Sequence, residues 1–172
     1  MRTAVTLPLD KSSAAKATEI MRRLADAGLA RDMLDLGYPP HITLGIWPSA
    51  DGLAEAVLRL ARRPPVELQF AGLAIFPGDP AVLWLAPAGS GALLRLHAAL
   101  AQRCPGAEPA YEPESWVPHA TLAQRLADPA AALAVAAEGW APFAASLERM
   151  ELVSVSPLRV IERLGFNHRP GR

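Results

Sequence analysis

A five-residue pattern, Pro-His-x-Thr-Leu, occurs twice in the chain, as Pro40–Leu44 and again as Pro118–Leu122. The two histidines are 78 residues apart (119 − 41), close to half of the 172-residue chain. A pattern that recurs at half-length is typical of a chain built from two similar supersecondary units. The sequence therefore predicts two related lobes, each of which delivers one imidazole and one hydroxyl to a shared place.

Each copy of the pattern lies in an apolar, β-prone run of residues. Successive side chains of a strand point to opposite faces, so His41 and Thr43 share one face, as do His119 and Thr121. The isoleucine, alanine and leucines of the two copies occupy the other face, which can pack on helices. We expect His41, Thr43, His119 and Thr121 to line a cleft as the catalytic residues.

Three further residues are candidates for substrate binding. Unbroken alternation would place Trp47 on the face of the first motif and Arg125 on the face of the second, where they could stack on a base and pair with a phosphate. Tyr38, just before Pro39-Pro40, is a candidate for the mouth of the cleft, although a tyrosine in a turn is the commoner explanation. Arg159 and Arg163 could form a basic rim, with an ordinary solvated face as the default.

The order of predicted elements indicates an α+β fold in which each lobe is an antiparallel sheet with helices on its outer face, around a central cleft. Asp10 is a predicted N-cap for a helix over 11–28, and Pro64-Pro65 ends another helix that starts near 49–51. The remaining predicted helices cover 90–103 and 128–139, and the predicted strands cover 3–9, 41–47, 66–76, 81–86, 116–122, 146–156 and 159–166. We expect residues 1–172 to form a single bilobal domain.

Composition narrows the class of protein. Formal net charge is zero, so duplex nucleic acid would find no overall cationic surface, and a long polyanion would need a local basic patch. Cys104 is the only cysteine, which excludes an intrachain disulfide. No apolar run has the roughly 20 residues needed to span a bilayer. We therefore expect a cytoplasmic protein with no cofactor, no metal site, no membrane association and no obligate protein partner.

Two H-x-[ST]-hydrophobic motifs about 80 residues apart make the chain resemble the 2H phosphoesterase superfamily, and within it the 2′-5′ RNA ligase-like branch that includes RNA 2′,3′-cyclic phosphodiesterases. The resemblance implies a hydrolase of 2′,3′-cyclic phosphates on RNA ends or small cyclic nucleotides, with a possible reverse 2′-5′ ligase activity and a role in RNA processing. It also implies that His119 activates water, that His41 protonates the leaving oxygen and that the 2′-phosphate is the product. One departure is that many members continue the second motif with Ala-Arg, whereas this chain reads Leu122–Arg125 with the arginine one place later.

The residues themselves agree with this chemistry. Unperturbed histidine titrates near pH 6.5, so one imidazole can take a proton while the other gives one. Two alternatives stay open from sequence: a nucleotide- or RNA-binding module on the same fold with little turnover, or an unrelated α+β protein with two buried strand histidines. The sequence does not distinguish whether the substrate is an RNA end or a mononucleotide. His97, in the helix over 90–103, is predicted to be a surface or boundary residue.

Overall fold

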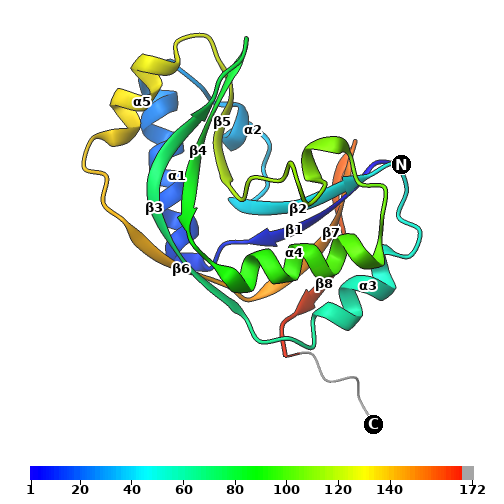
Figure 1. Cartoon of the computed structure of the whole chain (residues 1–172). Helices are drawn as coiled ribbons and strands as arrows, with labels where there is room; N and C mark the ends of the chain where they lie inside the picture. Colours follow the sequence, from blue (N-terminus) through cyan, green and yellow to red (C-terminus); the bar gives the residue numbers. More distant parts are fainter. Residues whose placement is uncertain (168–172) are drawn as a thin grey trace.

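The computed structural model describes residues 1–167, in which eight antiparallel strands form one continuous, strongly curved sheet (Figure 1). The strands follow the spatial order β6-β3-β4-β5-β2-β1-β7-β8. Their bounds are β1 (Thr3–Pro8), β2 (His41–Trp47), β3 (Val66–Phe76), β4 (Ala81–Ala88), β5 (Ala120–Leu126), β6 (Phe143–Leu147), β7 (Arg149–Val155) and β8 (Leu158–Gly165).

Helices α1, α4 and α5 begin where the sequence supplies a side chain that accepts from free backbone N–H groups. Asp10 accepts from Ser12 N and Ser13 N, Ser90 from Leu93 N, and Asp128 from Ala131 N. The bounds are α1 (Lys11–Asp26), α2 (Asp32–Asp35), α3 (Leu53–Leu60), α4 (Gly91–Arg103), the 3₁₀ turn η1 (Pro109–Tyr111) and α5 (Pro129–Ala137). Within residues 1–167, no helix has both the length and the apolar character that a membrane span requires.

The sheet divides into two lobes, and the division falls between β5 and β2. One lobe combines β6, β3, β4 and β5 with α1 and α5, and the other combines β2, β1, β7 and β8 with α3 and α4 (Figure 1). The only register pair that joins β2 to β5 within the described residues is Ile42 with Ala120, and both side chains are fully buried. The α+β fold of two related lobes predicted from the doubled motif is confirmed, with the two motif strands adjacent at the junction.

Helix α2, the 3₁₀ turn η1 and the separate strand β6 were not predicted from the sequence. Helix α2 has only four residues, too few to carry a periodic pattern. The strand predicted over 146–156 is in fact two strands, because the chain leaves one lobe and enters the other at Glu148: β6 pairs with β3, whereas β7 pairs with β1 and β8. The strand predicted over 116–122 is displaced to Ala120–Leu126, so His119 lies directly before β5. The other predicted strands and helices are confirmed, with shifts at their ends.

Candidate active site

The junction of the two lobes brings the two motifs into a reciprocal arrangement. Antiparallel pairing of Ile42 with Ala120 sets His41 opposite Thr121 and Thr43 opposite His119. Because Ile42 and Ala120 face the core, these four polar side chains face the other way. All four are partly exposed, so an incoming group can reach them. The structure thus brings together the four residues predicted to be catalytic.

Both histidines are held by the same local hydrogen bond. His41 Nδ1 lies 2.8 Å from the carbonyl oxygen of Pro39, and His119 Nδ1 lies 2.7 Å from that of Val117. A carbonyl oxygen can only accept, so each Nδ1 carries a proton. In the neutral ring Nε2 therefore keeps its lone pair, as a general base requires. The proline before each histidine favours extended backbone at Pro39 and Val117, which presents the carbonyl two residues back.

The surroundings of both imidazoles disfavour their charged forms. Burial lowers the pKa of His41 and of His119 below the ordinary histidine value. The positive charge of His119 lowers the pKa of His41 further, whereas the bond to Pro39 and the charge of Glu151 oppose this. The electrostatic coupling disfavours a doubly protonated pair. The site is therefore suited to hold one proton between two imidazoles.

Aromatic rings hold each imidazole in place. The Tyr38 ring meets His41 edge-on with a centroid separation of 4.8 Å. Phe76 meets His119 edge-on at 5.0 Å, and Trp84 lies 5.7 Å from the same imidazole. Neither Trp84 nor Phe76 was among the residues predicted for the site. Only the pairing of Trp84 with Thr121 across β4 and β5 would have indicated their place beside the second motif.

A buried carboxylate lies behind Tyr38. The Tyr38 hydroxyl donates to Glu151 Oε2 (2.8 Å) and accepts from the Thr6 hydroxyl (2.7 Å). Glu151 Oε1 accepts from Arg149 Nε (2.8 Å) and Arg163 Nε (3.1 Å). Burial alone would raise the pKa of Glu151, but the hydrogen bonds from Arg149 and Tyr38 outweigh it and lower the pKa, so the carboxylate is ionised. Burial also raises the pKa of Tyr38, which therefore stays a neutral phenol.

Trp47 does not lie on the face of the two histidines, which corrects the expectation from alternation. Val5 pairs with Gly45 and Thr6 pairs with Thr43, so Leu44 is an extra residue in β2, a β-bulge. Beyond the bulge the alternation is reversed, and Trp47 turns into the core. Its side chain is 5% exposed, its indole N–H donates to Cys104 O at 2.9 Å, and neither ring face is free to stack on a base.

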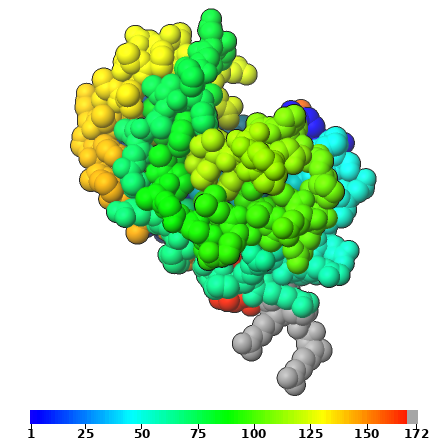
Figure 2. Space-filling view, in the orientation of Figure 1, coloured from blue at the N-terminus to red at the C-terminus, as the bar shows by residue number. Residues whose placement is uncertain are grey.

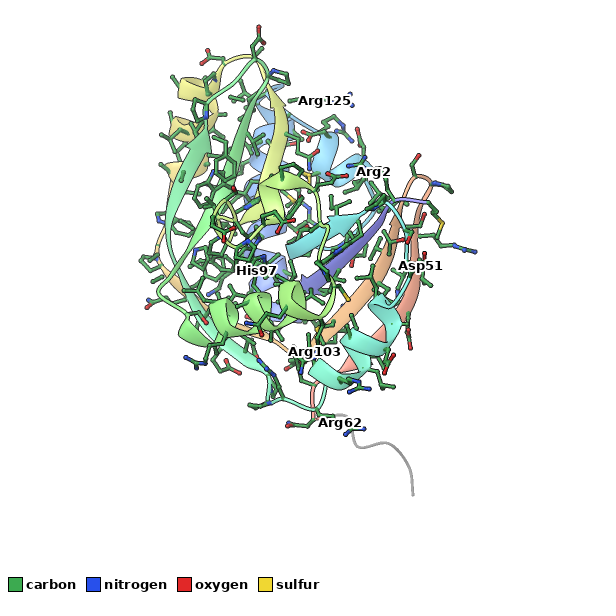
Figure 3. All side chains as sticks on the ribbon, turned by 45° about the vertical axis from the view of Figure 1, so that its right-hand side comes forward. Arg2, Asp51, Arg62, His97, Arg103 and Arg125 are labelled. Atoms are coloured by element: carbon green, nitrogen blue, oxygen red, sulfur yellow. The ribbon has the colours of Figure 1, made fainter. Side chains whose placement is uncertain are left out.

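Arg125 is also placed away from the motif histidines, near the far end of β5 and exposed rather than turned into the core. Leu83 pairs with Ala123 and Trp84 with Thr121, so β5 carries an extra residue directly after its own threonine, and a second irregularity follows before Leu126. Arg125 lies next to α2, beside a surface groove of about 560 Å³ that Arg31 and Asp32 also line. Figure 3 shows Arg125 at the far end of its lobe, well separated from His97.

Trp116 ties the second motif to the first. Its indole N–H donates to the backbone oxygen of Thr43 at 3.0 Å, and its ring stacks on His97 with a centroid separation of 3.9 Å and an interplanar angle of 5°. His97 is therefore buried at 4% exposure, not a surface residue as predicted from its helix. The segment 105–118, which leads into His119, lies across the molecule between the lobes (Figure 2).

Within residues 1–167, no cluster of three or more His, Cys, Asp or Glu side chains is placed to hold a metal ion. The groups at the junction are instead two imidazoles that can exchange protons and two hydroxyls that can donate hydrogen bonds. Such a set suits proton transfer to and from oxygen atoms, with hydroxyl donors for developing negative charge.

Comparisons with known proteins show the family and the fold of the chain. The sequence matches the profile of the 2′-5′ RNA ligase superfamily over residues 13–157. The fold is similar to TT0787 of Thermus thermophilus (21% identity, TM-score 0.67, 99% of this chain and 100% of that one). It is also similar to E. coli LigT in complex with 3′-AMP (17% identity, TM-score 0.63, 97% and 98% of the two chains). The comparison with curated protein sequences found no match. The chain therefore belongs to the 2′-5′ RNA ligase superfamily of 2H phosphoesterases.

Proposed function

We propose that this protein hydrolyses 2′,3′-cyclic phosphates, on RNA ends or on nucleotides, by acid–base catalysis that uses two histidines and no metal. The observation that carries the proposal is the reciprocal pairing at the junction, where each imidazole stands opposite the threonine of the other motif. Each imidazole has Nδ1 bound to a carbonyl, which leaves Nε2 for the substrate.

In the proposed reaction, Nε2 of neutral His119 takes a proton from water as the water oxygen bonds to phosphorus. The bond between phosphorus and the 3′-oxygen breaks, and Nε2–H of protonated His41 gives its proton to that oxygen, which leaves a 2′-phosphate. The hydroxyls of Thr43 and Thr121 donate to the non-bridging oxygens, where negative charge accumulates. Burial lowers the pKa of both histidines, but the charge of Glu151 opposes this at His41 and not at His119, which supports the assignment of His41 as the acid.

The structural neighbours support the proposal that the ligand is of nucleotide size. LigT has been crystallised with 3′-AMP, ATP and NADP⁺, so a fold of this shape accepts nucleotides. Tyr38 stands against His41 and is our remaining candidate for contact with the substrate. The assignment of residues 1–172 to one domain and of the protein to the cytoplasm stays a prediction from the sequence.

The experiment is hydrolysis of 2′,3′-cyclic AMP and of a short RNA with a 2′,3′-cyclic end in the presence of EDTA, with the products separated by chromatography. We expect turnover of at least one substrate at an undiminished rate in EDTA, with a 2′-phosphate product. A 3′-phosphate product would reverse the proposed leaving group. No turnover of either substrate would reject the proposal and favour a binding module on this fold.

A further inference from the structure

Two arginines near the site have no part in the proposed chemistry. Arg149 and Arg163 both donate through Nε to the same oxygen of Glu151, whose side chain is 1% exposed. One buried negative charge therefore holds two positive charges, and the group carries a net charge of +1. Two guanidinium groups that share one carboxylate oxygen repel each other, so an additional anion beside them would be stabilised.

These arginines lie on the same face of the sheet as the catalytic residues. Thr43 pairs with Thr6, Thr6 pairs with Glu151, and Glu151 pairs with Arg163, so the four residues form a row across β2, β1, β7 and β8. Residues paired directly across strands project to the same face. Three strand spacings separate Thr43 from Arg163, or roughly 14 Å between backbones, and a long side chain can shorten that distance.

Glu151 orients both arginines through their Nε atoms and leaves their terminal Nη atoms available to a ligand. Nε of each is fixed on Glu151, while no hydrogen bond from the terminal Nη atoms of either arginine is found within residues 1–167. The side chains are 37% exposed for Arg149 and 66% exposed for Arg163, so their outer edges face solvent. Guanidinium N–H groups held in this way present paired donors that match the oxygens of a phosphate.

Tyr38 connects this pair of arginines to the reacting centre. Its hydroxyl is bonded to Glu151 and its ring stands edge-on against His41, so it covers the space between them. A substrate that places its cyclic phosphate at the two histidines and extends over Tyr38 would bring its next anionic group to Arg149 and Arg163. The net charge of the whole chain is zero, and this local excess is the kind of basic patch that a polyanionic ligand needs.

We propose that Arg149 and Arg163 form a subsite for a second phosphate group of the substrate, beyond the reacting cyclic phosphate. The inference rests on the proposed function and sharpens it: the preferred substrates carry a phosphate on the 5′ side of the reacting ribose. Both an RNA end and a 5′-phosphorylated nucleoside 2′,3′-cyclic phosphate supply that group, whereas 2′,3′-cyclic AMP does not.

The test compares kcat/KM for three substrates: 2′,3′-cyclic AMP, its 5′-phosphorylated form, and the dinucleotide ApA with a 2′,3′-cyclic end. The variant is Arg163→Gln, because Arg149 then remains to pair with buried Glu151. Arg159→Gln is the matched control on the same strand. Arg159 pairs with Ser154, which alternation places on the opposite face of β7 from Glu151.

We expect wild type to have a higher kcat/KM for the two substrates with an additional phosphate, mainly because their KM is lower. Arg163→Gln should reduce this preference roughly fivefold to tenfold, as the loss of one partly exposed charge-assisted contact implies, and Arg159→Gln should keep it. The preference should also fall as salt is raised. Equal preference in wild type and Arg163→Gln would overturn the subsite, while preference for the dinucleotide alone would show that the subsite reads an internucleotide phosphate.

Direct binding separates this inference from the proposed function. Calorimetric titration with 2′-AMP and with ApA carrying a 2′-phosphate requires no turnover. Tighter binding of the dinucleotide product by wild type, lost in Arg163→Gln and kept in Arg159→Gln, would support the subsite even if hydrolysis failed. Equal affinities for the two ligands in wild type would refute it, whatever the hydrolysis assay showed.

Discussion

Replacement of Trp116 by phenylalanine probes how the two motifs are kept in register. The indole N–H of Trp116 donates to Thr43 O at 3.0 Å, and its ring is 8% exposed and stacked on His97. Apart from the Ile42–Ala120 register pair between β2 and β5, this hydrogen bond is a second tie between the first motif and the segment that leads into His119. The variant keeps an aromatic ring but deletes the donor.

The magnitude follows from what is lost. An acceptor left without its partner costs about 1–3 kcal/mol, and the missing part of a buried ring adds about 1 kcal/mol. A total of about 2–4 kcal/mol lowers the melting temperature of a chain of this size by about 5–15 °C. If the second motif moves by about 1 Å, the reaction slows by up to about 100-fold, mainly in kcat.

The assay combines thermal unfolding with steady-state hydrolysis of 2′,3′-cyclic AMP at a temperature where the variant is folded. Trp140→Phe is the matched control, because Trp140 is partly buried against Phe143 in the lobe of β6, apart from the two motifs. It should lower the melting temperature without a comparable loss of kcat. Wild-type kcat in Trp116→Phe, together with a melting temperature within about 1 °C of wild type, would refute the reasoning.

Three further predictions follow from the same structure. Glu151→Gln should lower the free energy of unfolding by about 2–4 kcal/mol at pH 7. The pKa of Glu151 is lower in the folded chain than in the unfolded one, so the carboxylate stabilises the fold above its unfolded pKa, and this stabilisation is lost as pH falls through the folded pKa. Urea denaturation should therefore show the difference between the variant and wild type shrinking below about pH 4. Gly45→Ala should destabilise by about 1–3 kcal/mol in the same assay, because an added Cβ would stand 2.7 Å from Cζ3 of Trp47, whereas Gly72→Ala meets only one methyl at 3.9 Å and should be tolerated. Burial lowers the pKa of both motif histidines, so the pH profile of kcat/KM should be a bell with its maximum below about pH 6.5, and a maximum at about pH 8 would contradict the assignment.

The sequence was sufficient for the features that depend on local pattern. Asp10 caps the helix it was expected to cap, and the doubled motif predicted both the two lobes and the four polar residues at their junction. These predictions succeed because capping and alternation act over a few residues, and because a repeated motif carries its own geometry with it. The helix expected to start near 49–51 begins instead after Gly52, without a side-chain cap.

The errors in placing residues along the two motif strands arise at β-bulges, which cannot be recognised from the sequence. A bulge follows the threonine of each motif, at Leu44 and at Leu122. The first reverses the alternation that was used to place Trp47, whereas β5 has a second irregularity before Leu126, so simple alternation does not place Arg125. A bulge depends on what the neighbouring strand requires, so it is a property of the pair of strands and not of either sequence alone. That both bulges occupy the same place in the motif indicates that they help to aim the histidines.

The row from Thr43 to Arg163 could not be found from sequence for a related reason. Its members belong to four strands whose order in the sheet differs from their order in the chain. Glu151 in particular follows Glu148 and Arg149 in the sequence and is not distinguished from them by it; only the register with Thr6 and Arg163 explains why this carboxylate is buried.

The most direct test of the two-histidine account is hydrolysis of the preferred cyclic phosphate by His41→Ala and His119→Ala, with each fold checked by circular dichroism. The account predicts that both variants lose at least about 100-fold in kcat, since each deletes one of the two proton-transfer groups, while both remain folded. A folded variant of either histidine that kept near-normal kcat would contradict the account.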